Sequence, residues 1–356
     1  MTEADYSTSR PVMVTGATGF VAGWLVRRLL EEGITVHAPV RDPSNEKKTA
    51  HLRRLAGELP GSIVFFKADL LDPGSYGEAM KGCGVVFHTA SPFTSDFEDA
   101  QRDLVDPAVK GTRNVLDSAN ATEGVERVVV TSSVAAIYGD NADLKDIPDG
   151  TLTERNWNET SSLDHQPYSY SKVQAEKTAW EIAGAQNGWR LVTVNPSLVI
   201  GPTLSGKSTS ESHSLVRRLG DGTLKAGAPP LELGMVDVRD VAEAHMRAGF
   251  VEHADGRFIA SAGTVSFLDL ANMLRARFGD EWPFPKRELP KWLLWLVGPI
   301  VDGSLSRRMI SRNMGYPWKA DNSKSREQLG LEYGPVSRAA TDMFEQMIET
   351  GAVKEP

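Results

Sequence analysis

Residues 12–32 read VMVTGATGFVAGWLVRRLLEE, and this stretch decides the fold. Val12 to Thr15 have the apolar character of a buried strand, and from Phe20 onward apolar residues recur at intervals of three and four, as in an amphipathic helix. The glycines between them allow a tight turn whose backbone N–H groups can approach a pyrophosphate at the helix N-terminus. We therefore expect a bound dinucleotide in contact with Gly16, Thr18, Gly19, Phe20 and Val21. A glycine turn without a ligand is the alternative.

The first half of the chain alternates short apolar runs with longer amphipathic stretches, the pattern of βα units that build a parallel sheet. Predicted strands cover Val12–Thr15, Thr35–Val40, Ile63–Lys67, Val85–His88, Arg127–Thr131 and Leu191–Val194. Predicted helices cover Phe20–Glu32 and Val105–Asn120, and a long helix begins near Pro167 because proline suits the first helical position. This pattern predicts an α/β fold: a doubly wound parallel sheet in residues 1–195, to which residues near 231–248 return. Residues 196–356 are expected to form mainly a smaller substrate-binding lobe.

Charge and cysteine content narrow the choice of partners and compartment. The chain has 356 residues, a formal net charge of -8 and one cysteine, Cys83. A negative field repels nucleic acid and anionic membranes, so neither is expected as the main partner, and a local basic patch is the alternative that total charge leaves open. One cysteine excludes an intrachain disulfide, and the polar N-terminus lacks an apolar signal segment, so we expect a cytoplasmic monomer or homodimer. No two histidines have the spacing of metal ligands, so no metal is expected.

The tryptophans and the longest apolar cluster are expected to be covered in the folded protein. Residues 292–301 form an apolar run about half as long as the roughly 20 residues that span a membrane, and a Gly-Pro pair interrupts it. We expect a buried or partner-facing helix there. Tryptophan is usually well buried, so core positions are predicted for Trp282, Trp292, Trp295 and Trp318, with the lining of an apolar pocket as the alternative.

Basic residues at the end of the second predicted strand indicate a cofactor whose adenosine ribose carries a phosphate. An acidic residue there would hold the ribose diol of NAD, but this strand ends at Arg41, followed by Lys47 and Lys48. Arginine binds phosphate with two donors and lysine adds a point charge, so NADP(H) is the expected cofactor. The alternative is that Arg41 and Lys48 are ordinary solvated loop charges. Asp69 follows the third predicted strand and is expected either to accept from the adenine amino group or to stabilise a turn.

A tyrosine and a lysine at the start of the long helix suit proton transfer. Tyr168 and Lys172 are four residues apart and project from one helix face, so the ammonium is expected to lower the tyrosine pKa. A tyrosine tuned in this way can protonate an alkoxide formed by hydride addition. Ser133, just after the fifth predicted strand, would bind the substrate oxygen, with Ser132 as its rival. Tyr170 lies on a different helix face and is expected to serve packing or hydrogen bonding.

Together these motifs resemble those of the extended short-chain dehydrogenase/reductase superfamily, specifically its dihydroflavonol reductase-like group of carbonyl and aldehyde reductases. The resemblance extends over nearly the whole chain and includes Val40–Pro43, His88–Phe93, Gly111–Leu116, Asn195–Ser197 and Asn322–Lys324. Ala22 in place of a third glycine is similar to fungal-type carbonyl reductases of this group.

The resemblance implies a Rossmann-type fold and NADPH-dependent reduction of an aldehyde or ketone. It implies that Ser133, Tyr168 and Lys172 form a catalytic triad, and that Lys172 also binds the nicotinamide ribose. Arg41 and Lys48 would then hold the NADPH phosphate. The other expected cofactor contacts are Asp69, Leu70, Thr89, Ala90, Ser91, Tyr168, Pro196 and Val199. The small carbonyl or alcohol substrate is expected to lie against Phe93, Ser133 and Thr203.

Three other functions fit parts of the sequence. A nucleotide-sugar epimerase or dehydratase would share the triad but retain NAD tightly. Arg41 and Lys48 argue against this function because they favour the phosphorylated cofactor. A non-catalytic NADP sensor would keep the glycine turn without needing Tyr168. A P-loop ATPase would use residues 201–208, GPTLSGKS, but the polar residues that follow Lys207 do not predict the helix which that motif requires.

Overall fold

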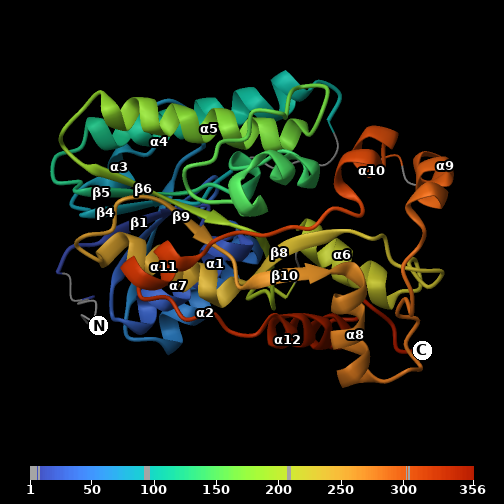
Figure 1. The fold of residues 1–356 in the computed structure, drawn as a ribbon. Coiled ribbons are helices and arrows are strands. Elements are labelled where there is room, and N and C mark those ends of the chain that lie inside the picture. The colour runs from blue at the N-terminus through green and yellow to red at the C-terminus, as the bar shows by residue number, and fades with distance from the viewer. Residues whose placement is uncertain (1–5, 7–8, 92–96, 207–209, 302, 304) are drawn as a thin grey trace.

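A computed structural model describes all residues of the chain except 1–5, 7–8, 92–96, 207–209, 302 and 304. Its centre is a seven-stranded parallel sheet in the order β3-β2-β1-β4-β5-β6-β9 (Figure 1). The strands are β1 (Val12–Thr15), β2 (Thr35–Val40), β3 (Ser62–Lys67), β4 (Val85–His88), β5 (Arg127–Thr131), β6 (Arg190–Pro196) and β9 (Gly256–Ala260). The strand order reverses beside β1, which creates a crevice between the carboxyl ends of β1 and β4.

Helices cover both faces of this sheet. One face carries α1 (Phe20–Glu31), α2 (Glu46–Glu58), α7 (Val238–Phe250) and α11 (Ser323–Gln328). The opposite face carries α3 (Gly77–Met80), α4 (Asp106–Asn120), which a π-helical turn precedes, and α5 (Pro167–Gly184). Each layer buries its own apolar cluster against the sheet, because parallel strands are apolar on both sides.

The doubly wound α/β prediction is confirmed. The six predicted strands form within two residues of their expected ends, and α1 and α5 begin where the glycine turn and Pro167 place them. The sequence interpretation did not identify α2 or β9. Residues 232–237 lie in a second, smaller sheet rather than the large one, while α7 packs on α1.

The second sheet is the base of a C-terminal lobe, which also contributes helices on the right of Figure 1. It contains β7 (Leu198–Ile200), parallel to β8 (Glu232–Asp237), and β10 (Gly263–Ser266), antiparallel to β8. Around it lie α6 (Glu211–Gly220), α8 (Phe267–Phe278) and α12 (Val336–Glu349), whose apolar sides form a separate core. Two further helices, α9 (Lys291–Val301) and α10 (Arg307–Asn313), pack on each other at the edge of the lobe.

The core prediction for the tryptophans is wrong for two of the four. Trp282 and Trp318 are buried, but Trp292 and Trp295 on α9 are exposed. The physical reason is that α9 packs on α10 through only one of its sides. Within the described residues, no helix is both long enough and apolar enough to cross a membrane.

Candidate active site

The glycine turn after β1 has the geometry that its sequence predicts. Gly16 has a φ of +65°, and a Cβ atom placed there would lie 2.9 Å from the Cα of Ala90, so a side chain is excluded. Helix α1 starts at Phe20, and no side chain caps it at Gly19. The first N–H groups of an uncapped helix attract an anionic ligand.

A cavity of ≈ 690 Å³ lies directly at this glycine turn. A second cavity elsewhere in the molecule has a volume of ≈ 800 Å³. The cavity at the turn is the one that the predicted residues line. It follows the carboxyl ends of β1 to β4, the crevice where doubly wound sheets bind ligands. Its lining includes ten of the predicted cofactor residues: Gly16, Thr18, Gly19, Arg41, Lys48, Asp69, Leu70, Thr89, Ala90 and Ser91. A cradle of glycines at one end and two cations beside β2 at the other fits a dinucleotide with a phosphorylated ribose.

The other predicted contact residues lie outside this lining or have different partners. Phe20 and Val21 occupy the first turn of α1, Pro196 ends β6, and Val199 lies in β7. Phe93 lies outside the described residues. Asp69 lines the cavity, and its carboxylate also accepts from the backbone N–H of Leu71 at 2.9 Å, so it stabilises a turn at the cavity wall.

Lys172 joins the start of α5 to the cavity. Gln166 adopts a left-handed conformation and Pro167 takes the first helical position, so Tyr168 and Lys172 lie in the first two turns. The ammonium of Lys172 donates a hydrogen bond of 3.0 Å to the hydroxyl of Ser91, a cavity residue. Burial lowers the pKa of Lys172 to about 8, while the Glu176 carboxylate opposes this shift. The side chain therefore stays mainly protonated at neutral pH.

The pKa of Tyr168 shifts in the direction opposite to the sequence expectation. Burial raises it, because removal from water disfavours the phenolate, and the carboxylate of Glu211 raises it further. The Lys172 ammonium lies 5.7 Å from the centre of the Tyr168 ring. Tyr168 is thus a neutral phenol in this structure, the form that can donate a proton.

The two candidate serines after β5 have different partners. Ser132 is buried and donates its hydroxyl hydrogen to the Glu176 carboxylate over 2.5 Å. Ser133 is half-buried, and its oxygen accepts from the backbone N–H of Ala135 at 3.1 Å. This contact caps the short 3-10 turn Val134–Ala136 and leaves the hydroxyl hydrogen of Ser133 able to serve a substrate oxygen.

Glu176 is a buried carboxylate next to the candidate site, and the sequence interpretation missed it. It lies one turn after Lys172 on α5 and forms an ion pair of 2.6 Å with the buried guanidinium of Arg257 on β9. Its carboxylate also accepts from Ser132 and Asn195. The spacing of four from Lys172 was a usable signal for Glu176, whereas nothing in the local sequence pointed to Arg257.

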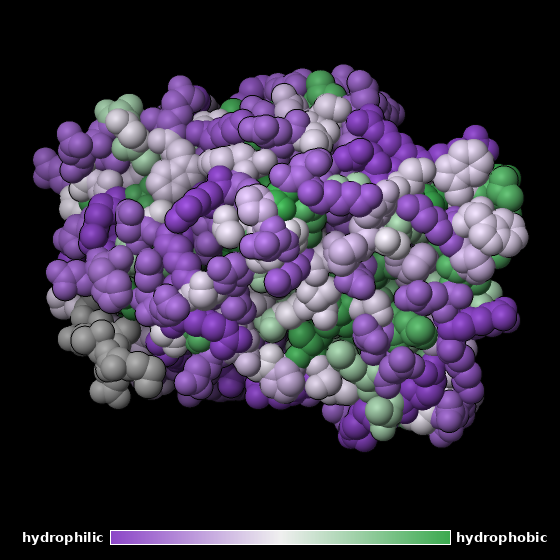
Figure 2. Space-filling model, in the orientation of Figure 1, coloured by the Kyte–Doolittle hydropathy of each residue, from purple (hydrophilic) through white to green (hydrophobic). Residues whose placement is uncertain are grey.

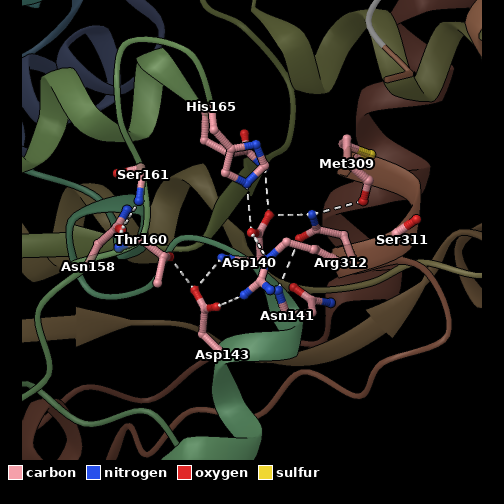
Figure 3. A network of polar contacts seen from close by, with 12 residues as sticks. Asp140, Asn141, Asp143, Asn158, Thr160, Ser161, His165, Met309, Ser311 and Arg312 are labelled. Carbon is pink, nitrogen blue, oxygen red and sulfur yellow. Dashed lines mark hydrogen bonds and ion pairs between the residues drawn. The ribbon is translucent and has the colours of Figure 1, made fainter. Parts of the chain in front are cut away.

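A second missed network anchors the loop that leads into α5 (Figure 3). Asp140, fully buried, accepts hydrogen bonds from His165 at 2.7 Å, Arg312 at 2.6 Å and Asn313 at 2.6 Å. Arg312 and Asn313 belong to α10, and His165 stands three residues before Tyr168. The network therefore ties the C-terminal lobe to the start of the helix that carries Tyr168.

Asp140→Asn is expected to lower the free energy of unfolding at pH 7 by about 2 kcal/mol, because the amide cannot accept from all three donors. Burial raises the pKa of Asp140, but the hydrogen bonds from His165, Asn313 and Arg312 outweigh burial and hold it below its usual range. The carboxylate therefore stabilises the fold above the ordinary carboxyl pKa and loses this effect as pH falls through the folded pKa. Urea unfolding at several pH values measures the difference. Exposed Asp146→Asn is the control, and equal stability of Asp140→Asn and the wild type at pH 7 would contradict the assignment.

The loop after β7 packs against the rest of the lobe. Thr203 is buried, its backbone exchanges two hydrogen bonds with the Gln346 side chain of α12, and its hydroxyl contacts Ser205. Helix α6 begins only at Glu211, and Lys207 lies outside the described residues. In the part of the chain that the structure describes, no three His, Cys, Asp or Glu side chains are placed to hold a metal ion.

Comparison with known proteins agrees with this arrangement. Residues 12–255 match the model of the NAD dependent epimerase/dehydratase family. Cinnamoyl-CoA reductase 1 of Petunia hybrida is 36% identical over 348 residues, which cover 97% of this chain and 94% of the petunia protein.

Solved structures extend the likeness to the whole fold. Gre2 of Candida albicans, solved in complex with NADPH, is 30% identical with a TM-score of 0.75 over 96% of this chain and 99% of its own. The yeast methylglyoxal/isovaleraldehyde reductase Gre2, also solved with NADPH, is 29% identical with a TM-score of 0.75 over the same shares. The chain therefore belongs to the NAD-dependent epimerase/dehydratase family, and within it to the NAD(P)-dependent, dihydroflavonol reductase-like reductases of the extended short-chain dehydrogenase/reductase superfamily.

Proposed function

We propose that this protein reduces an aldehyde or ketone to an alcohol with NADPH, in a reversible reaction that Ser133, Tyr168 and Lys172 catalyse. The observation that carries the proposal is the hydrogen bond from Lys172 to Ser91, because it brings the start of α5 to the wall of the cavity at the glycine turn. The reductase activities named for the petunia and yeast relatives support the same reaction class.

The environment of Tyr168 suits the acid step. NADPH, when bound at this cavity, would supply the hydride for the carbonyl carbon. The oxygen then gains negative charge, and the neutral phenol of Tyr168 donates a proton to it. Lys172, charged at neutral pH, stabilises the phenolate that this donation leaves. The raised pKa of Tyr168 before reaction keeps its proton in place until the oxygen becomes basic.

Ser133 completes the constellation by binding the substrate oxygen. The backbone N–H of Ala135 donates a hydrogen bond to the Ser133 oxygen and fixes its position. The Ser133 hydroxyl can therefore donate its hydrogen from a fixed point. A fixed donor aimed at a developing charge stabilises the transition state more than the ground state. Ser132 is a poorer candidate, since Glu176 accepts its hydrogen.

Turnover with a carbonyl panel tests the proposed function. Purified protein is mixed with NADPH and aromatic or aliphatic aldehydes and ketones, and the loss of reduced nicotinamide is compared with the alcohol formed. We expect equal amounts of both for at least one carbonyl. Binding of NADPH without turnover of any carbonyl would instead favour a non-catalytic sensor.

Arg41→Ala is expected to raise KM for NADPH roughly 10- to 100-fold and to change KM for NADH little, the effect of losing charge-assisted hydrogen bonds to one phosphate. Arg41 and Lys48 line the cavity beside β2, where the 2′-phosphate would lie. Lys47→Ala is the matched control, because Lys47 is outside the cavity lining. Initial rates with each cofactor measure the effect, and an equal loss with both cofactors would refute the role of Arg41.

A further inference from the structure

Helix α9 presents an apolar surface to solvent. Trp292 is 65% exposed, Ile300 84% and Val301 82%, and Trp295, Leu296 and Val297 are also exposed. Figure 2 shows green and white residues at the right-hand edge, where Figure 1 places α9, with purple residues around them. Monomeric proteins seldom leave such a group of large apolar side chains uncovered without a binding role.

The packing of α9 fixes which side faces outward. Leu294 and Gly298 face α10, and a Cβ atom on Gly298 would lie 3.1 Å from the side chain of Ile310. Trp292, Leu296 and Ile300 recur every four residues and therefore share the opposite face. Because the inner side is closely packed, the outer face cannot turn inward without breaking the contact with α10.

The segment of the chain that contains α9 is basic, although the chain as a whole is acidic. Residues 287–319 contain six basic and two acidic side chains, a net charge of +4 in a chain of -8. Arg312 is matched by Asp140 and Asp143, but Arg307 and Arg308 are exposed beside α9. The guanidinium of Arg307 lies 4.7 Å from the centre of the Trp295 ring. The expectation that membranes repel this protein used the total charge, whereas its distribution is uneven.

We propose that α9 and the basic residues beside it bind the surface of a lipid bilayer that contains anionic lipids. Exposed Trp with Leu, Val and Ile beside Arg and Lys is the composition of helices that lie in the bilayer interface. The helix has 11 residues, about 16 Å in length, so it can lie in the interface but cannot cross a hydrocarbon core of about 30 Å.

A second copy of the chain is a poorer occupant of this face. A two-fold interface would place the same basic residues opposite each other, and like charges there oppose binding. The outer face of α9, roughly 16 Å by 10 Å, is also far smaller than the area of about 800 Å² per partner in stable interfaces. A bilayer needs no matching surface and supplies the opposite charge.

Co-sedimentation of the full chain with vesicles tests the proposal. We expect binding to vesicles of phosphatidylcholine mixed with phosphatidylserine, weaker binding to phosphatidylcholine alone, and loss of the difference when salt rises from about 0.1 M to about 1 M. No binding of the wild type to the anionic vesicles would overturn the proposal. A dimer that Ile300→Glu dissociates, without vesicle binding, would assign the face to a second copy and overturn it as well.

Two variants locate the contact. Ile300→Glu is expected to weaken vesicle binding about tenfold or more, and the double variant Arg307→Ser/Arg308→Ser roughly 30-fold on anionic vesicles only. Val64→Glu, at a 43% exposed position on β3, is the matched control and should bind like the wild type. Thermal unfolding checks that each variant is folded, and wild-type binding by a folded Ile300→Glu variant would overturn the assignment to α9.

Discussion

Replacing Tyr168 with Phe is expected to lower kcat for carbonyl reduction about 10²- to 10⁴-fold, the usual contribution of a positioned general acid. Phenylalanine fills the same space in the first turn of α5 but has no proton to donate. NADPH affinity should stay within about threefold of the wild type, because phenylalanine keeps the ring in place and every residue that lines the cavity is unchanged. Steady-state rates with NADPH and the best carbonyl, together with an NADPH binding titration, measure the two effects separately.

Tyr170→Phe is the matched control for this experiment. Tyr170 lies two residues further along α5 and therefore on a different helix face. It should retain wild-type kcat within about twofold. Full activity in Tyr168→Phe, or an equal loss in the two variants, would remove Tyr168 from the role of proton donor.

Glu176→Ala is expected to lower the free energy of unfolding by about 3–5 kcal/mol, the effect of leaving a buried charge without its partner. The guanidinium of Arg257 would lose its ion pair, and Ser132 and Asn195 would lose an acceptor. The pKa of Lys172 should fall further, because Glu176 raises it in the wild type. Urea unfolding gives the stability, and the pH dependence of kcat/KM gives the effect on Lys172.

A double variant distinguishes the loss of charge pairing from the loss of packing. Glu176→Leu with Arg257→Met removes both charges and keeps much of the volume, so it should recover a large part of the stability that Glu176→Ala loses. The assignment of a structural ion pair would be contradicted if Glu176→Ala alone cost less than about 1 kcal/mol.

Local patterns sufficed for the parts of the structure that local interactions determine. The strand, glycine turn and helix of residues 12–32 form as predicted, because turn geometry and apolar periodicity act over a few residues. The same holds for the start of α5, which begins at Pro167 as the sequence predicts.

Contacts between distant residues could not be predicted in this way. Asp140 and Arg312 are 172 residues apart, and Glu176 and Arg257 are 81 apart, so only the folded chain brings each pair together. Trp292 and Trp295 were predicted in the core on composition alone. Their exposure depends on which side of α9 meets α10, and the sequence of the helix does not contain that information.

The transfer of deuterium from labelled NADPH to the alcohol tests the central claim most directly. Purified protein is incubated with NADPH that carries deuterium at the transferable C4 position and with the best carbonyl substrate, and the alcohol is analysed by mass spectrometry and NMR. Direct hydride transfer predicts one deuterium on the former carbonyl carbon, added from one face of the carbonyl group only. An alcohol without deuterium, or consumption of no NADPH with any carbonyl tried, would contradict the proposal that this chain is an NADPH-dependent carbonyl reductase.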